Sequence, residues 1–70
     1  MMDSVYKVVE LVGTSTESWE EAAKNAVAKA SKSIRDLRIA EVSELDMQLE
    51  DDAVITYRAK VKLSFKYQGD

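Results

Sequence analysis

The segment 55–67 alternates strictly between apolar and polar side chains, and this pattern limits the possible folds more than any other feature. Its apolar positions are Ile55, Tyr57, Ala59, Val61, Leu63, Phe65 and Tyr67. Its polar positions are Thr56, Arg58, Lys60, Lys62, Ser64 and Lys66. A period of two predicts a β-strand with one face on a core and the other face polar. At the usual rise this strand would be about 43 Å long.

A helix is expected over about residues 16–35. Apolar side chains recur there at helical spacing, at Trp19, Ala22, Ala23, Ala26, Val27, Ala30 and Ile34. Acidic residues crowd the predicted first turn and basic residues the end, as the helix dipole favours. Thr14 and Glu17 have capping-box spacing, and Ser15 or Thr16 are alternative N-caps. Such a helix is roughly 30 Å long and cannot cover the whole strand.

Two further strands are predicted. Residues 5–12 are β-branched and aromatic and should form a strand that stops at Gly13. Residues 37–49 form the other, with Ala40 and Val42 facing the helix. The opposite parity holds too many apolar residues for a solvated face: Ile39, Glu41, Ser43, Leu45, Met47 and Leu49. A turn at 50–52 should join this strand to the last as a hairpin.

The predicted fold class is α+β, in the order β-α-β-β, with a three-stranded antiparallel sheet on one helix in a single domain spanning residues 1–70. An all-antiparallel sheet places the first strand beside the third. The alternative is a parallel pairing of the first and second strands through a right-handed crossover. Because the last strand should overhang the helix, and because a chain of 70 residues buries only roughly 60% of its unfolded surface, we expect neighbouring subunits to cover the ends.

Composition excludes several functions. The chain has no cysteine and no histidine, so any metal should be a hard cation held by oxygen. These absences, with the lack of a Gly-rich phosphate loop, argue against an enzyme. The balance of 13 acidic and 10 basic residues, net −3, argues against nucleic acid. Apolar runs are too short for a membrane span or a signal segment, so a cytoplasmic protein is expected.

The opening Val5–Ser15, with the sequence VYKVVELVGTS, resembles that of the dodecins. The resemblance continues through the alanine-rich helix, the stretch Ala40-Glu41-Val42, and the alternating strand that ends at Ser64-Phe65. It implies a dodecin-like fold whose sheet wraps partly around the helix. It also implies a homododecamer built from trimers, a hollow shell that binds flavins in pairs for storage rather than catalysis.

Two positions depart from the flavin-binding members. The tryptophan that stacks on the flavin is replaced by Ile39, and the glutamine that hydrogen-bonds the ring is replaced by Arg58. Isoleucine has no π-face, and arginine offers donors without an acceptor. We therefore expect flavin binding to be lost or weak. The segments 35–42, 57–58 and 64–67 are instead similar to the calcium dodecins, which implies Ca²⁺ in place of flavin.

Glu41, Asp46 and Glu50 are the predicted calcium ligands. Glu41 and Asp46 have opposite strand parity, so they can face one ion only if a bulge intervenes or if several subunits contribute. Competing interpretations are an ion pair of Glu41 with Arg58 or Lys60, a surface or intersubunit salt bridge of Asp46, and a solvated turn at 50–52. Trp19 is interpreted as a packing residue.

Three functions remain open from the sequence. The first is a calcium-binding homododecamer. The second is a storage shell for riboflavin or FMN with a modified pocket. The third is a structural or interaction shell without a specific ligand.

Overall fold

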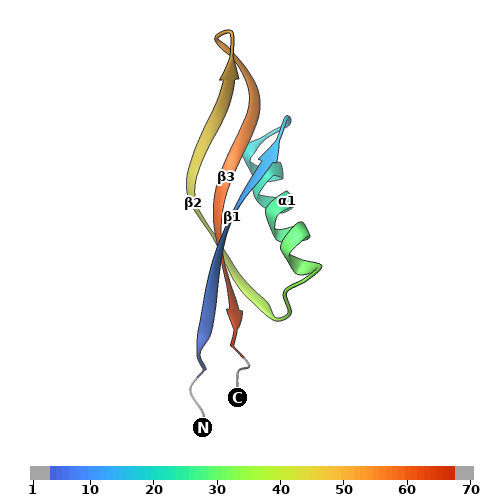
Figure 1. The fold of residues 1–70 in the computed structure, drawn as a ribbon, viewed down its shortest axis with the longest axis vertical. Coiled ribbons are helices and arrows are strands. Elements are labelled where there is room, and N and C mark those ends of the chain that lie inside the picture. Colours follow the sequence, from blue (N-terminus) through green and yellow to red (C-terminus); the bar gives the residue numbers. More distant parts are fainter. Residues whose placement is uncertain (1–3, 68–70) are drawn as a thin grey trace.

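The computed structural model describes residues 4–67. Its elements are β1 (Tyr6–Ser15), α1 (Trp19–Ser31), β2 (Leu37–Glu50) and β3 (Ala53–Lys66), shown in Figure 1. The sheet order is β1-β3-β2, and β3 pairs antiparallel with both neighbours. The predicted order and antiparallel sheet are confirmed, and the alternative with a parallel crossover is wrong.

The helix begins later than predicted. Thr14 and Ser15 remain in β1, where they pair with β3. The N-cap is Ser18, whose Oγ accepts a hydrogen bond of 3.1 Å from the backbone N–H of Glu21. Ser15 Oγ accepts from the N–H of Glu17 at 2.9 Å and so stabilises the turn before the helix. The predicted caps at residues 14–16 are wrong because pairing with β3 holds the chain extended through Ser15.

The helix also ends earlier than predicted, at Ser31. The N–H of Ile34 still donates to the carbonyl of Ala30 at 2.9 Å, and the Ile34 side chain packs against the core. Asp36 then takes a positive φ of 62°, a conformation that aspartate tolerates better than most residues. The chain reverses there into β2, so residues 32–35 lie outside the helix.

The core is formed by small side chains of α1 against the centre of β3. Its buried residues are Ala22, Ala26, Ala30, Ala59, Val61 and Leu63. The alternating pattern of the last strand is thus confirmed where the helix lies on it. The small alanine side chains of α1 allow the helix to lie close to the sheet.

Gly13 lies within β1 opposite Ala59, not after the end of the strand as predicted. A Cβ on this residue would overlap the carbonyl oxygen of Ala22 and would lie 3.0 Å from the Cβ of Ala26. The glycine is therefore needed for helix–strand contact rather than for a turn.

The hairpin turn has two residues. Glu50 pairs with Ala53, and Asp51 and Asp52 between them have φ values of 52° and 63°. Positive φ at both central residues is what a type I′ turn requires, and aspartate is one of the residues that accept it. The predicted turn is confirmed, but Glu50 belongs to the end of β2.

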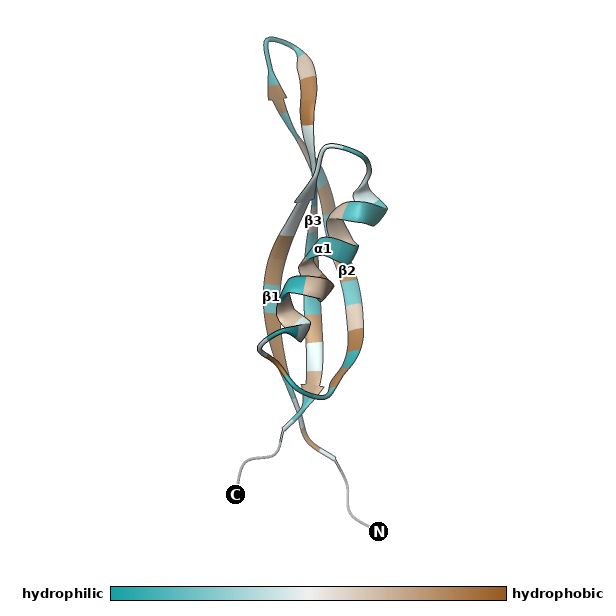
Figure 2. Ribbon diagram, turned by 90° about the vertical axis from the view of Figure 1, so that its right-hand side faces the viewer, coloured by the Kyte–Doolittle hydropathy of each residue, from teal (hydrophilic) through white to brown (hydrophobic). Residues whose placement is uncertain are grey.

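The β2–β3 hairpin overhangs the helix, as expected. The helix has 13 residues, about 20 Å of length, whereas β2 and β3 have 14 residues each, about 46 Å. Figure 2 shows the ribbon of the hairpin projecting beyond α1, with stretches coloured brown for hydrophobic residues along it. Every residue of β2 after Leu37 is exposed. The Cα radius of gyration is 14.5 Å, against about 11 Å for a compact domain of this length.

The tight contact at Gly13 gives a first prediction. Gly13→Ala should destabilise the fold by about 1–3 kcal/mol or more, because the methyl group overlaps helix backbone that cannot move without displacing the core. Urea denaturation followed by far-UV circular dichroism measures the change. Glu10→Ala, on the exposed side of the same strand, is the matched control and should change the midpoint little. Equal midpoints for the two variants would contradict the close approach.

Candidate functional site

Irregular pairing decides which side chains share the sheet face opposite α1, here called the outer face. The register of β2 against β3 shifts between Leu37 and Ile39, between Val42 and Glu44, and between Gln48 and Leu49. Residues directly opposite one another in a ladder point to the same side. The second shift leaves Ser43 without a partner in the register, and it brings Glu41 and Asp46 onto the outer face together.

The outer face carries three rungs of paired side chains across the strands β1, β3 and β2. These rungs are Glu10–Lys62–Glu41, Val12–Lys60–Glu44 and Thr14–Arg58–Asp46. A basic residue of β3 stands in the middle of each rung, and an acidic residue of β2 stands at its side. Opposite charges in such positions stabilise the pairing of the strands modestly.

Arg58 and Asp46 form a two-pronged ion pair. Arg58 Nε donates to Asp46 Oδ1 at 2.7 Å, and Arg58 Nη2 donates to Asp46 Oδ2 at 3.0 Å. These hydrogen bonds, more than the guanidinium charge itself, lower the pKa of the Asp46 carboxyl below its ordinary value of 3.8. They also raise the pKa of Arg58. The expected surface salt bridge of Asp46 is thus present, and both of its carboxylate oxygens are engaged.

The ion pair between Lys60 and Glu44 on the next rung is weaker. Lys60 Nζ lies 3.2 Å from Glu44 Oε1, with the side chains 39% and 68% exposed. The predicted ion pair of Glu41 with Arg58 or Lys60 is wrong, since those two bases bind Asp46 and Glu44. The register places Glu41 opposite Lys62 instead.

Trp19 links the start of α1 to β2. Its indole Nε1 donates to the main-chain carbonyl of Asp46 at 2.9 Å. Its ring meets that of Tyr57 edge-on, with centroids 5.1 Å apart. The packing role predicted for Trp19 is confirmed. The sequence does not predict the hydrogen bond to Asp46, because only the fold brings residues 27 positions apart together.

The three predicted calcium ligands are spread along the hairpin. Glu41 and Asp46 stand opposite Lys62 and Arg58, which are four residues apart on β3 and so separated by about 13 Å. Glu50 lies at the turn. Ligand oxygens must lie about 2.3–2.6 Å from a calcium ion, so these side chains of one chain do not share an ion. Across residues 4–67, no three acidic side chains gather closely enough to hold a metal.

The two flavin-equivalent positions are also separated. Ile39 is 61% exposed on the outer face, opposite Ser64. Arg58 lies six residues from Ser64 along β3, about 20 Å away. Neither the proposed metal ligands nor the flavin-equivalent residues form a closed pocket within a single chain.

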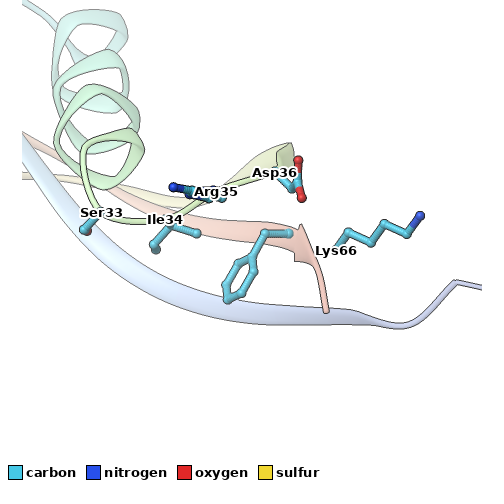
Figure 3. A pocket seen from close by; sticks show the side chains of 6 residues that line it. Ser33, Ile34, Arg35, Asp36 and Lys66 are labelled. Atoms are coloured by element: carbon cyan, nitrogen blue, oxygen red, sulfur yellow. The ribbon is translucent and has the colours of Figure 1, made fainter. Parts of the chain in front are cut away.

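An open hollow of about 590 Å³ lies below the end of α1 and is lined by Ser33, Ile34, Arg35, Asp36, Phe65 and Lys66. Figure 3 shows that the charged side chains of Arg35, Asp36 and Lys66 point away from one another. A small-molecule site normally has polar groups that converge on the ligand. This hollow therefore lacks the chemistry of a specific ligand site.

Comparison with known proteins identifies the family. The Dodecin family model matches residues 5–68. The chain belongs to the dodecin family. It is 51% identical to the calcium dodecin of Mycobacterium tuberculosis over 63 residues, which is 90% of this chain and 89% of that protein.

Solved dodecin structures agree with this fold. The dodecin of Streptomyces coelicolor superposes with a TM-score of 0.92 at 36% identity, with both chains fully covered. A crystal structure of the calcium dodecin of M. tuberculosis, described as a calcium-chelating antigen with a novel calcium-binding site, gives a TM-score of 0.83 at 48% identity over 96% of each chain. The resemblance to the calcium-dodecin branch is confirmed. Within the described dodecin chain, α1 is too short to cross a membrane.

The Arg58–Asp46 pair predicts an acid-dependent effect. Since Asp46 has a folded pKa below 3.8, its contribution to stability is complete above pH 3.8 and is lost as the pH falls through the lowered value. Arg58→Gln should move the Asp46 pKa upward, and a pH titration of the Asp46 carboxyl carbon by NMR measures the shift.

Lys60→Gln is the matched control for this titration. Lys60 lowers the Asp46 pKa less than Arg58 does, so its removal should raise that pKa by a smaller amount. An Asp46 titration that Arg58→Gln leaves unchanged would show that the two side chains do not pair in solution.

Proposed function

We propose that this dodecin is a calcium-binding shell protein that acts in storage or buffering rather than in catalysis. The observation that carries the proposal is that neither of the two flavin-equivalent residues, Ile39 and Arg58, is suited to bind a flavin. Ile39 offers no ring for stacking, and Arg58 is tied to a carboxylate. The 51% identity to a calcium dodecin supports the same choice.

We propose that the calcium ligands come from more than one copy of the chain. Ca²⁺ takes six to eight oxygens, and the carboxylates of Glu41, Asp46 and Glu50 are too far apart in one chain to supply them together. Main-chain carbonyls and water can complete a set that begins with one or two carboxylates. In a homododecamer of trimers, the assembly implied by the resemblance, neighbouring copies would supply the remaining ligands.

Uncovered apolar surface supports the assembly. Val42, Leu45 and Met47 pair with residues on the helix side of β3, yet their side chains are 47%, 52% and 45% exposed. A shallow apolar groove of about 410 Å³ runs between α1 and β2 and includes Val27, Ala40 and Val42. A second copy that covers this surface would add about 1.5–3 kcal/mol for each large apolar side chain that it fully buries.

The second candidate is flavin storage with a rearranged pocket. The family resemblance favours it, while Ile39 and Arg58 argue against it. A shell without a specific ligand is the third candidate, and the pairing of acids with bases on the outer face is compatible with it.

The proposed function predicts calcium binding without flavin binding. Metal-stripped protein titrated by calorimetry with Ca²⁺, and separately with riboflavin, should give heat for the first and none for the second. Micromolar riboflavin binding without calcium heat would reverse the choice in favour of flavin storage.

Thermal melting with Ca²⁺ or with EDTA provides the control, because a ligand of the folded state stabilises it by RT ln(1 + [L]/Kd). The calcium-loaded protein should melt at the higher temperature. Equal melting temperatures together with no binding heat would favour the shell without a specific ligand.

The assembly generates a separate prediction. The protein should elute from a sizing column near twelve times its chain mass of 7.9 kDa. Leu45→Glu should reduce the assembled fraction, because it places a charge on the apolar side of β2. Gln48→Glu adds the same charge to the polar outer face of the same strand and should leave the assembly intact. A stable, folded monomer of the unmodified chain would contradict the proposed shell.

A further inference from the structure

Two groups of charged side chains lie far apart along the molecule. The first, here called the acidic tip, is the end of the hairpin with Glu50, Asp51 and Asp52, all of which are exposed. The second, here called the basic foot, lies where the chain passes from α1 into β2. Figure 1 shows the hairpin end at the top and this connection below the helix. The basic foot consists of Lys32, Arg35, Arg38 and Lys66.

The charges of the acidic tip and the basic foot are not neutralised within the chain. Among residues 4–67, the ion pairs lie on the outer face, and neither of them includes a residue of the tip or the foot. The N–H of Lys66 donates to the carbonyl of Asp36 at 3.3 Å, which places the end of β3 beside the connection. Asp36 is the one acidic residue among the four basic ones of the foot, so the foot keeps a net positive charge.

Apolar surface lies between the two charged groups, on the helix side of the sheet. On the overhang, Leu45 and Met47 are 52% and 45% exposed. Nearer the foot, the shallow groove between α1 and β2 includes Val27 and Val42. An apolar centre with charged surface around it is the usual anatomy of a stable protein–protein interface.

The spacing from apolar surface to charge is the same toward both ends of β2. Met47 stands four residues before Asp51, and Val42 stands four residues after Arg38, about 13 Å in each case. A second copy that lies antiparallel to the first, with its Met47 over the groove, therefore brings its acidic tip to the basic foot. The contact is reciprocal, because a two-fold axis relates the same surfaces of the two copies.

We infer that the overhang, with its acidic tip, and the groove, with its basic foot, form one interaction surface for a second copy of this chain. The inference rests on the proposed shell and names one of the contacts that build it. Burial of the apolar side chains supplies most of the affinity. The charges set the direction, because a parallel arrangement would place tip against tip and foot against foot.

A charge swap between the tip and the foot tests this contact. Glu50→Lys and Arg38→Glu should each raise the protein concentration at half-assembly about three- to tenfold, because each brings like charges together. The double variant Glu50→Lys/Arg38→Glu should return to within about twofold of the unmodified chain, since it exchanges the two charges. Analytical ultracentrifugation over a dilution series measures the change, and far-UV circular dichroism establishes that each variant is folded.

Glu10→Lys is the matched control for the charge swap. It changes the net charge as Glu50→Lys does, but it lies on the outer face, on the opposite side of the sheet from the contact. It should therefore shift the assembly little. Raising NaCl from about 50 mM to about 500 mM should reduce the effect of the single charge reversals, because salt screens exposed charges.

Cysteine crosslinking reports the direction of the contact. The unmodified chain has no cysteine, so the variant Glu50→Cys/Arg38→Cys carries only the introduced pair. These positions are twelve residues apart on one strand, about 40 Å, so a short bis-maleimide cannot join them within one chain. It should instead give a covalent dimer with position 50 of one copy joined to position 38 of the other, as identified by mass spectrometry. Glu50→Cys alone should give little dimer.

The outcomes separate this inference from the proposed function. A folded monomer of the unmodified chain would refute both the shell and the contact. Assembly that neither single charge reversal weakens, or that the double variant does not recover, overturns the contact and leaves the shell standing. Efficient crosslinking of Glu50→Cys alone also overturns it, since tip would then meet tip. No step of the test uses added calcium, so the absence of calcium binding would leave this result unchanged.

Discussion

The difference in length between α1 and the β2–β3 hairpin is the constraint on which the rest of the structure depends. The helix contacts β1 and β3 and barely touches β2, so the core ends where α1 ends. Beyond it, β2 is an edge strand with apolar side chains such as Leu45 and Met47 in solvent. A long edge strand with exposed apolar residues is a template for association. A single chain therefore leaves apolar surface of β2 uncovered. The candidate ligands lie on the same strand.

The bulge at Ser43 determines which side chains of β2 lie on the outer face. Without it, Glu41 and Asp46 would point to opposite sides, because strand parity has a period of two. With it, Glu41, Glu44 and Asp46 all lie opposite basic residues of β3. The bulge leaves Leu45 and Met47 on the helix side, where they extend the apolar surface. The one extra residue in β2 thus places its acidic side chains on one face of the sheet and its apolar side chains on the other, although simple alternation along the sequence does not predict this division.

Regular periodicity made most of the fold predictable. The alternation of residues 55–67 and the alanine stripe of the helix led to the correct elements, their order and the core. The start of the helix is not predictable from propensity, because Ser15 is held in β1 by its pairing with Tyr57 of β3, and local propensity carries no information about such a partner. The prediction that Gly13 ends the strand is wrong for a similar reason. Glycine is required there because a Cβ would overlap the carbonyl oxygen of Ala22 on the helix. The ion-pair partners depend on the register of β2 against β3. Because this register shifts at three places, counting odd and even positions in the sequence does not predict which residues lie opposite one another.

Charge is distributed unevenly over the described residues. On the outer face, the acidic residues of β1 and β2 stand beside bases of β3, so that face is close to neutral. The net charge of −3 then reflects acids elsewhere, in the first turn of α1 and at the hairpin end with Glu50, Asp51 and Asp52. The helix acids complement the dipole, whereas the hairpin acids lie at the tip of the overhang, where Glu50 is opposite Ala53 rather than a base and Asp51 and Asp52 form the turn. Negative charge is thus concentrated at the tip of the overhang, away from the core, whereas the outer face balances its acidic residues with basic ones.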